Sequence, residues 1–128
     1  MDLKAKHGVK ESLAEGLSVV IRDTIQGSGD YEVLSKEDVE VIAKRTAIRQ
    51  SLGCDDTKCL IDIGRALGTK FMVAGAISKF GDTYNISLRL LNTMGDDAGV
   101  KRRINSNCKC PEDALIEAAK GTARKLLE

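Results

Sequence analysis

The chain has 128 residues, of which 42% are hydrophobic and 30% are charged, and its formal net charge is +1. This length supports one domain with a genuine core but not two ordinary domains, and the composition is that of a folded globular protein. The small net charge gives no global field for nucleic acid or an anionic membrane, and no run approaches the ~18 apolar residues of a membrane span. Residues 1–4 also lack the apolar region of a signal peptide.

The first half of the chain predicts alternating strands and helices. Residues 2–6 read as the stub of a strand, and residues 11–26 read as a helix with apolar side chains at helical spacing. A short alternating strand is expected at 31–34, followed by a helix over 35–52 that begins at a serine cap and ends at a glycine. A shorter helix then starts near residue 57, and Gly68 is its expected C′ residue.

The segment from Gly68 to Asn92 predicts a β-hairpin. Two strand-like runs flank Gly81-Asp82, and a two-residue loop that begins with glycine favours a primed turn. If Phe80 pairs with Thr83, the register of every other pair follows. One face of the hairpin is then apolar and the other polar or small, as in a half-covered antiparallel pair. The expected apolar pairs are Ile77–Ile86, Gly75–Leu88 and Val73–Leu90, and the expected polar or small pairs are Ser78–Asn85, Ala76–Ser87 and Ala74–Arg89.

A further strand over 100–107 and a final helix that begins near Pro111 complete the predicted elements. Right-handed crossovers place the first three strands parallel, and the hairpin extends the sheet antiparallel. The prediction is therefore one α/β domain over residues 1–128. Its mixed sheet of about five strands has the order 2-1-3-4-5, with strands 3-4-5 as an antiparallel meander, and it is packed with four helices.

Catalytic motifs are lacking in the sequence. The sole histidine, His7, lies near the terminus beside a glycine, and nothing in the sequence places partners for a catalytic role near it. No H-E-x-x-H, P-loop or G-x-S-x-G pattern occurs. The basic run 101–103 is interpreted as a solvated edge-strand face. We therefore expect no enzyme, no cofactor, no metal, no small-molecule substrate and no nucleic acid.

Four cysteines occur in two close pairs, Cys54 with Cys59 and Cys108 with Cys110. Such pairs suit an oxidising compartment, and we expect a Cys54–Cys59 disulfide, with Cys108–Cys110 as the less secure second pair. Four cysteines allow three connectivities, so cross-pairing stays open. The alternative is a thiol-based redox or zinc-binding module that uses all four cysteines, although C-x4-C with C-x-C departs from the usual zinc spacings.

Five segments carry a resemblance to a known family: Tyr31–Val39, Gly53–Cys59, Ile63–Ile77, Gly81–Tyr84 and Leu88–Asn92. Their order resembles bacterial envelope proteins related to the TolB amino-terminal domain and the curli-secretion (CsgG-like) lipoprotein family. In those proteins a strand leads to a helix, then to a glycine-flanked strand and to a strand that ends in an asparagine-threonine pair.

The resemblance implies a non-enzymatic envelope module that binds or assembles with other proteins or with itself. It implies a location in the periplasm or on the periplasmic face of the outer membrane. It also implies a shortened chain that lacks a leader or the start of its first strand, so that any membrane association would depend on an absent N-terminal anchor. The sequence departs from the curli channel because it has no hairpin segments suited to a transmembrane barrel, and from the lipoproteins because it has no lipobox cysteine.

Overall fold

The computed structural model describes residues 3–29, 57–95 and 98–127. The elements in chain order are β1 (Lys4–Ala5), α1 (Glu11–Gly27), α3 (Thr57–Leu67), β2 (Phe71–Phe80), β3 (Thr83–Asn92), β4 (Gly99–Cys108), the 3-10 turn η2 (Glu112–Ala114) and α4 (Leu115–Leu127). None of the helices within these ranges is long and apolar enough to cross a membrane.

The sheet is built around the hairpin β2–β3. Its register is confirmed, since Phe80 pairs with Thr83, Ile77 with Ile86, and the ladder continues to Phe71 opposite Asn92. Gly81 has a φ of 59°, so the turn uses the positive φ that glycine tolerates at little cost. β1 pairs parallel to β2, and β4 pairs antiparallel to β3 with a bulge opposite Leu90/Leu91.

The predicted five-stranded sheet of order 2-1-3-4-5 packed with four helices is wrong. The described residues form a four-stranded sheet of order β1-β2-β3-β4, accompanied by α1, α3 and α4. The prediction included a strand at 31–34 and a helix at 35–52, and both lie outside the described residues. A short alternating run indicates local strand propensity but does not specify a partner in a sheet, which is why the extra strand could not be placed from sequence.

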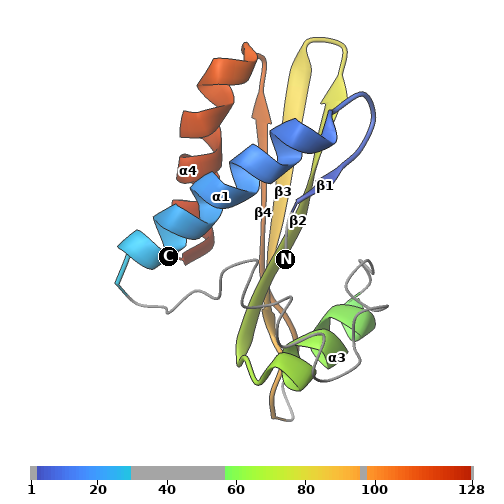
Figure 1. The fold of residues 1–128 in the computed structure, drawn as a ribbon, viewed down its shortest axis with the longest axis vertical. Coiled ribbons are helices and arrows are strands. Elements are labelled where there is room, and N and C mark those ends of the chain that lie inside the picture. Colours follow the sequence, from blue (N-terminus) through green and yellow to red (C-terminus); the bar gives the residue numbers. More distant parts are fainter. Residues whose placement is uncertain (1–2, 30–56, 96–97, 128) are drawn as a thin grey trace.

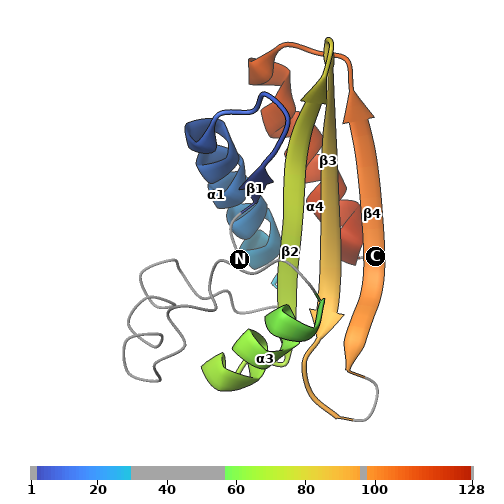
Figure 2. The same ribbon diagram turned by 90° about the vertical axis from the view of Figure 1, so that its right-hand side faces the viewer.

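α1 and α4 pack side by side on one face of the sheet (Figures 1 and 2). The predicted apolar face of α1 is confirmed at Leu17, Ile21 and Ile25, which are buried. They join the inward residues of the hairpin and of α4 in one core. The core residues include Ile77, Tyr84, Ile86, Leu88 and Leu90 from the sheet and Leu115, Ala119, Ala123 and Leu126 from α4.

Two buried hydroxyl groups tie the helices to the sheet layer. Ser18 on α1 accepts a hydrogen bond from the backbone N–H of Leu3 at 2.8 Å and donates to the Ala14 carbonyl at 2.7 Å. Thr122 on α4 donates to the Ala118 carbonyl at 2.7 Å and lies 3.0 Å from the Ser106 hydroxyl of β4. Both side chains therefore have hydrogen-bond partners where water does not reach them.

α3 lies on the opposite face of the sheet, at one end (Figures 1 and 2). Its contact centres on the fully buried Thr93, whose carbonyl accepts a hydrogen bond from Arg65 Nε at 2.6 Å. The Thr93 hydroxyl bonds to the carbonyls of Thr69 and Lys70. A side chain at Gly64 would collide with the Thr93 methyl group, so this glycine allows the close approach of helix and sheet. The helix ends as predicted at Gly68, with a φ of 73°.

Candidate interaction surface

The sheet face opposite α1 and α4 is exposed beyond the end that α3 covers. Figure 2 looks directly onto it. The registers of β2, β3 and β4 place eight residues together on this face, three of them exposed and five half-buried, and we call this set the open face. It consists of Ala76, Ser78, Asn85, Ser87, Arg89, Arg103, Asn105 and Asn107.

Three asparagines form a hydrogen-bonded group on the open face. The side-chain amide of Asn85 donates to Asn105 Oδ1 and to Asn107 Oδ1, both at 2.8 Å. Asn85 lies opposite Asn107 on the neighbouring strand, and Asn105 is diagonal to it. Because both oxygens of β4 accept from Asn85, the amide groups of Asn105 and Asn107 keep their N–H donors for other acceptors. The network therefore fixes the orientation of two exposed amides on a rigid strand.

The charges on this face have one sign. No aspartate or glutamate occurs in any of the four strands of the described structure, whereas six lysines and arginines do. Arg89 of β3 lies directly opposite Arg103 of β4.

The basic run 101–103 is spread over different surfaces because of the bulge in β4. Lys101 Nζ lies 4.9 Å from the centroid of the Phe71 ring, and Arg102 donates to the Lys125 carbonyl at the C-terminal end of α4 at 3.2 Å. Arg103 lies on the open face and is exposed. β4 is an edge strand in the described sheet, as expected from the basic run, but only one of its three cations belongs to the open face.

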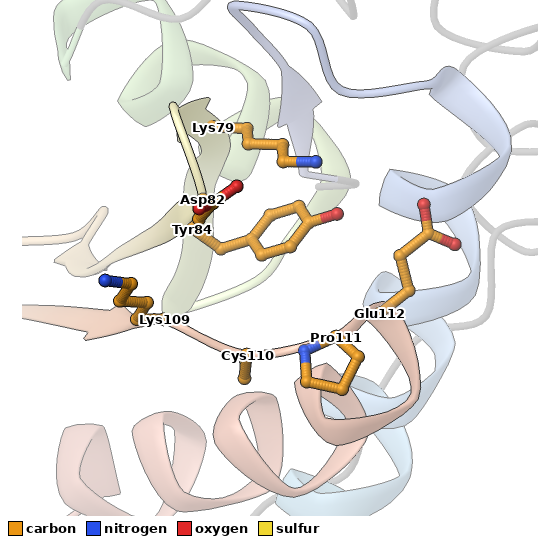
Figure 3. A pocket seen from close by; sticks show the side chains of 7 residues that line it. All are labelled: Lys79, Asp82, Tyr84, Lys109, Cys110, Pro111 and Glu112. Carbon is orange, nitrogen blue, oxygen red and sulfur yellow. The ribbon is translucent and has the colours of Figure 1, made fainter.

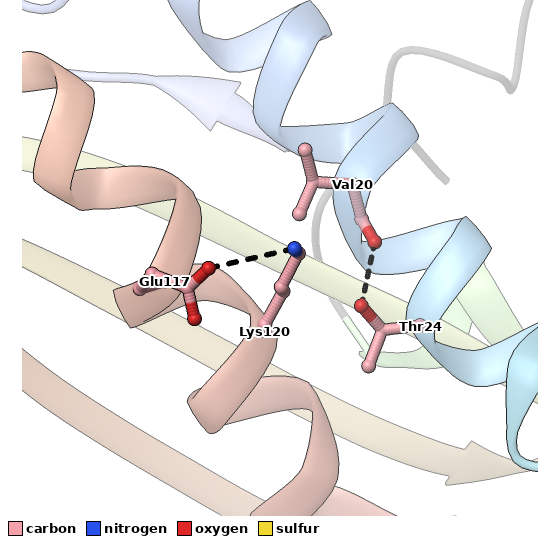
Figure 4. A network of polar contacts seen from close by, with 4 residues as sticks. All are labelled: Val20, Thr24, Glu117 and Lys120. Carbon is pink, nitrogen blue, oxygen red and sulfur yellow. Dashed lines mark hydrogen bonds and ion pairs between the residues drawn. The ribbon is translucent and has the colours of Figure 1, made fainter.

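The outer surface of α1 and α4 differs from the open face because it carries charges of both signs. Lys120 of α4 forms an ion pair with Glu117 at 3.5 Å and extends toward Val20 and Thr24 of α1 (Figure 4). Thr24 donates to the Val20 carbonyl at 2.8 Å. Charges of both signs are interspersed on these two helices, which is the usual arrangement on a solvated surface.

Both predicted cysteine pairs stay predictions. Cys108 and Cys110 are placed for a disulfide at the end of β4, with Cα atoms 5.3 Å apart, which is within the range that a disulfide allows. The expected pair of Cys54 and Cys59 lies outside the described residues and stays a prediction. No group of three or more histidine, cysteine or carboxylate side chains is placed to hold a metal ion in the part of the chain that the structure describes.

A shallow pocket of about 450 Å³ lies beside Cys110. Its walls come from the hairpin end and from the segment between β4 and α4 (Figure 3). The lining residues are Lys79, Asp82, Tyr84, Lys109, Cys110, Pro111 and Glu112. Lys79 Nζ lies 5.1 Å from the centroid of the Tyr84 ring. The pocket contains two lysines and two carboxylates, so its lining has no excess charge of one sign that would select a charged ligand.

His7 does not take part in either surface feature. It is exposed, and its ring centroid lies 5.1 Å from that of Phe80 at the hairpin end. Its backbone carbonyl accepts a hydrogen bond from the Lys79 N–H at 3.3 Å. The interpretation of His7 as a solvated residue agrees with this position.

Sequence reasoning missed the grouping of Arg103, Asn105 and Asn107. The signal was present in the alternation of polar residues along β4 and in the lack of carboxylates between Thr83 and Asn92. What the sequence did not supply was the register of β4 against β3, which brings Asn85 to Asn105 and Asn107.

Comparison with known proteins identifies the fold. No family model and no curated protein matches the chain. Among solved structures, the LpoB C-terminal domain from Escherichia coli aligns with a TM-score of 0.68 and 9% identity, over 84% of this chain and 77% of that one. The LpoB C-terminal domain from Salmonella enterica aligns with a TM-score of 0.62 and 12% identity, over 84% and 76%. An NMR structure of E. coli LpoB gives 0.52 and 11%, over 84% of this chain and 54% of that one.

At these identities the similarity shows a shared fold. It gives no support to the TolB-like or curli-secretion family that the sequence resembles, since the neighbours are LpoB domains.

Proposed function

We propose that this chain is a non-enzymatic module of the bacterial cell envelope that binds or assembles with other proteins through the open face. The observation that carries the proposal is the open face itself. It displays oriented amides and guanidinium groups on a rigid sheet, backed by a continuous core. Polar side chains held in fixed geometry on a flat surface are suited to recognition of another protein.

The envelope location is supported by three further observations. The fold is shared with LpoB C-terminal domains from two bacteria, and the sequence resembles envelope proteins. The Cys108–Cys110 pair is placed for a disulfide, and disulfides persist in oxidising compartments such as the periplasm. The proposed location is the periplasm or the periplasmic face of the outer membrane.

Site-specific photo-crosslinking in the source cell tests the function. A photoreactive side chain at Ser78 samples the open face without removing Arg103, Asn105 or Asn107, and the same side chain at Arg124 on α4 samples the helix layer as a control. We expect a defined adduct with an envelope protein from position 78 and not from position 124. Adducts only with cytosolic proteins would contradict the proposed compartment, and adducts only from position 124 would contradict the proposed surface.

A further inference from the structure

We propose that the open face recognises a carboxylate-rich surface on a separate protein. This inference deepens the proposed function and rests on it. It assigns the partner's chemistry from three features: a row of hydrogen-bond donors on β4, the sign of the charge around that row, and the mixed charge of the opposite layer.

The donor row consists of Arg103, Asn105 and Asn107, which alternate along β4 and share one face of the strand. Alternate residues on an antiparallel strand lie ~7 Å apart, so the row presents three donor groups at regular intervals. All three residues are exposed. Asn85 donates to the amide oxygens of the two asparagines, so their own N–H groups remain donors for a partner. Carboxylates are acceptors only, and charged acceptors make the stronger hydrogen bonds with such donors.

The charge near the donor row also favours an anionic partner. Arg103 is an exposed cation at one end of the row. No carboxylate belongs to any described strand. A protein surface normally intersperses both signs, and a region of single sign favours a partner of the opposite sign and speeds its encounter. The structure thus combines directional donors with a positive potential.

The helix layer of a second copy, as far as the structure describes it, is a poorer match than a separate acidic protein. The layer of α1, η2 and α4 contains six carboxylates, but it also contains nearly as many cations, so its surface does not complement the open face. The carboxylates are Glu11, Glu15, Asp23, Glu112, Asp113 and Glu117, and the cations near or within the same elements are Lys10, Arg22, Lys120, Arg124 and Lys125.

Anionic lipid and nucleic acid are poorer matches as well. Surface helices that bind lipid combine basic residues with large apolar side chains, and single-stranded nucleic acid stacks its bases on aromatic rings. The eight residues of the open face include neither an aromatic ring nor a large aliphatic side chain. A guanidinium group pairs with carboxylate and with phosphate alike, so the preference for a protein follows from the lack of aromatic rings and large apolar side chains on this face.

The test uses two variants that alter the donor row without disturbing the fold. Arg103→Glu reverses an exposed charge. Asn107→Asp removes an amide donor but keeps an oxygen that can accept from Asn85. The matched controls make the same chemical changes on the helix layer, with Arg124→Glu for the first and Gln26→Glu for the second, both at exposed positions. Unchanged melting midpoints show that all four variants are folded.

The first measurement is an NMR titration of the ¹⁵N-labelled chain with poly-L-glutamate, followed through backbone and asparagine side-chain amides. We expect shifts at the side-chain amides of Asn105 and Asn107 that weaken with salt. We expect each open-face variant to lower the affinity by about fivefold to thirtyfold, as when one attractive contact becomes repulsive, with no loss in the controls. Shifts confined to α1 and α4, or equal losses in the controls, would overturn the inference.

The second measurement repeats the comparison with the protein captured at position 78, with phosphatidylglycerol vesicles and with the chain alone. The captured protein should lose affinity for the Arg103→Glu and Asn107→Asp variants only. If a protein is captured but neither variant weakens it, the proposed function stands and the carboxylate inference fails. If no protein is captured, the proposed function fails, even where poly-L-glutamate binds. Vesicle binding or self-association that depends on the same two residues would show that the open face binds a membrane or a second copy of the chain, and not an acidic protein.

Discussion

Replacing Gly75 with alanine should destabilise the fold, because the centre of the sheet has no room for a Cβ atom there. A Cβ at this position would collide with the Ser87 backbone carbonyl and would lie 2.8 Å from Leu88 Cδ2 and 3.0 Å from Leu3 Cδ2. The leucine side chains can move by rotamer changes, but the carbonyl belongs to the β2–β3 ladder and can move only with the strand. Overpacking of this kind costs about 1–3 kcal/mol, and Gly75→Leu should cost at least as much.

Thermal unfolding checks this prediction. For a domain of this size, 1 kcal/mol corresponds to about 4 °C in melting midpoint, so Gly75→Ala should lower the midpoint by about 4–12 °C. Gly16→Ala is the matched control, since Gly16 lies on the exposed side of α1, where an added Cβ atom would have nothing within 4 Å. That change should raise stability by up to about 1 kcal/mol through helix propensity. An unchanged midpoint for Gly75→Ala would refute the close approach of β2 to β3 at this residue.

Two other substitutions test the contacts that hold β1 and β4 in place. Ser18→Ala removes the acceptor of a buried backbone N–H and should lower the free energy of unfolding by about 1–3 kcal/mol in denaturant titration, whereas Ser12→Ala on the exposed side of the same helix should not lower it. Peptide mapping of oxidised protein without reductant should yield a peptide in which Cys108 is linked to Cys110, and a link from either residue to another cysteine would contradict local pairing. Cys108→Ser should lower the melting midpoint under oxidising conditions and leave it nearly unchanged under reducing ones, because a disulfide stabilises only while it is formed.

The hairpin could be predicted from sequence because all of its determinants are local. Gly81 fixes the turn, and one pair beside the turn then fixes the register of the whole ladder. The face of α1 could be predicted for a similar reason, since helical periodicity identifies Leu17, Ile21 and Ile25.

Other features depend on contacts between distant segments, and the sequence did not reveal them. The position of α3 depends on the fit between Gly64 and Thr93, which are 29 residues apart. The asparagine group depends on the register of β4, since a shift of one residue would turn Asn105 and Asn107 toward the core. The predicted five-stranded order was wrong for the converse reason, because strand propensity at 31–34, which lies outside the described residues, is a local property and does not specify pairing in a sheet.

The position of α3 also makes the two ends of the open face different. A flat, regularly spaced row of donors could accept a partner in two opposite orientations with similar contacts. α3 stands on this face at the end away from the β2–β3 turn (Figures 1 and 2), so a partner on the open face as proposed would meet the helix in one orientation and not in the other. The close packing of Gly64 on Thr93 holds α3 at that end. A glycine distant from Asn105 and Asn107 in the chain would in this way bias the orientation of the proposed assembly.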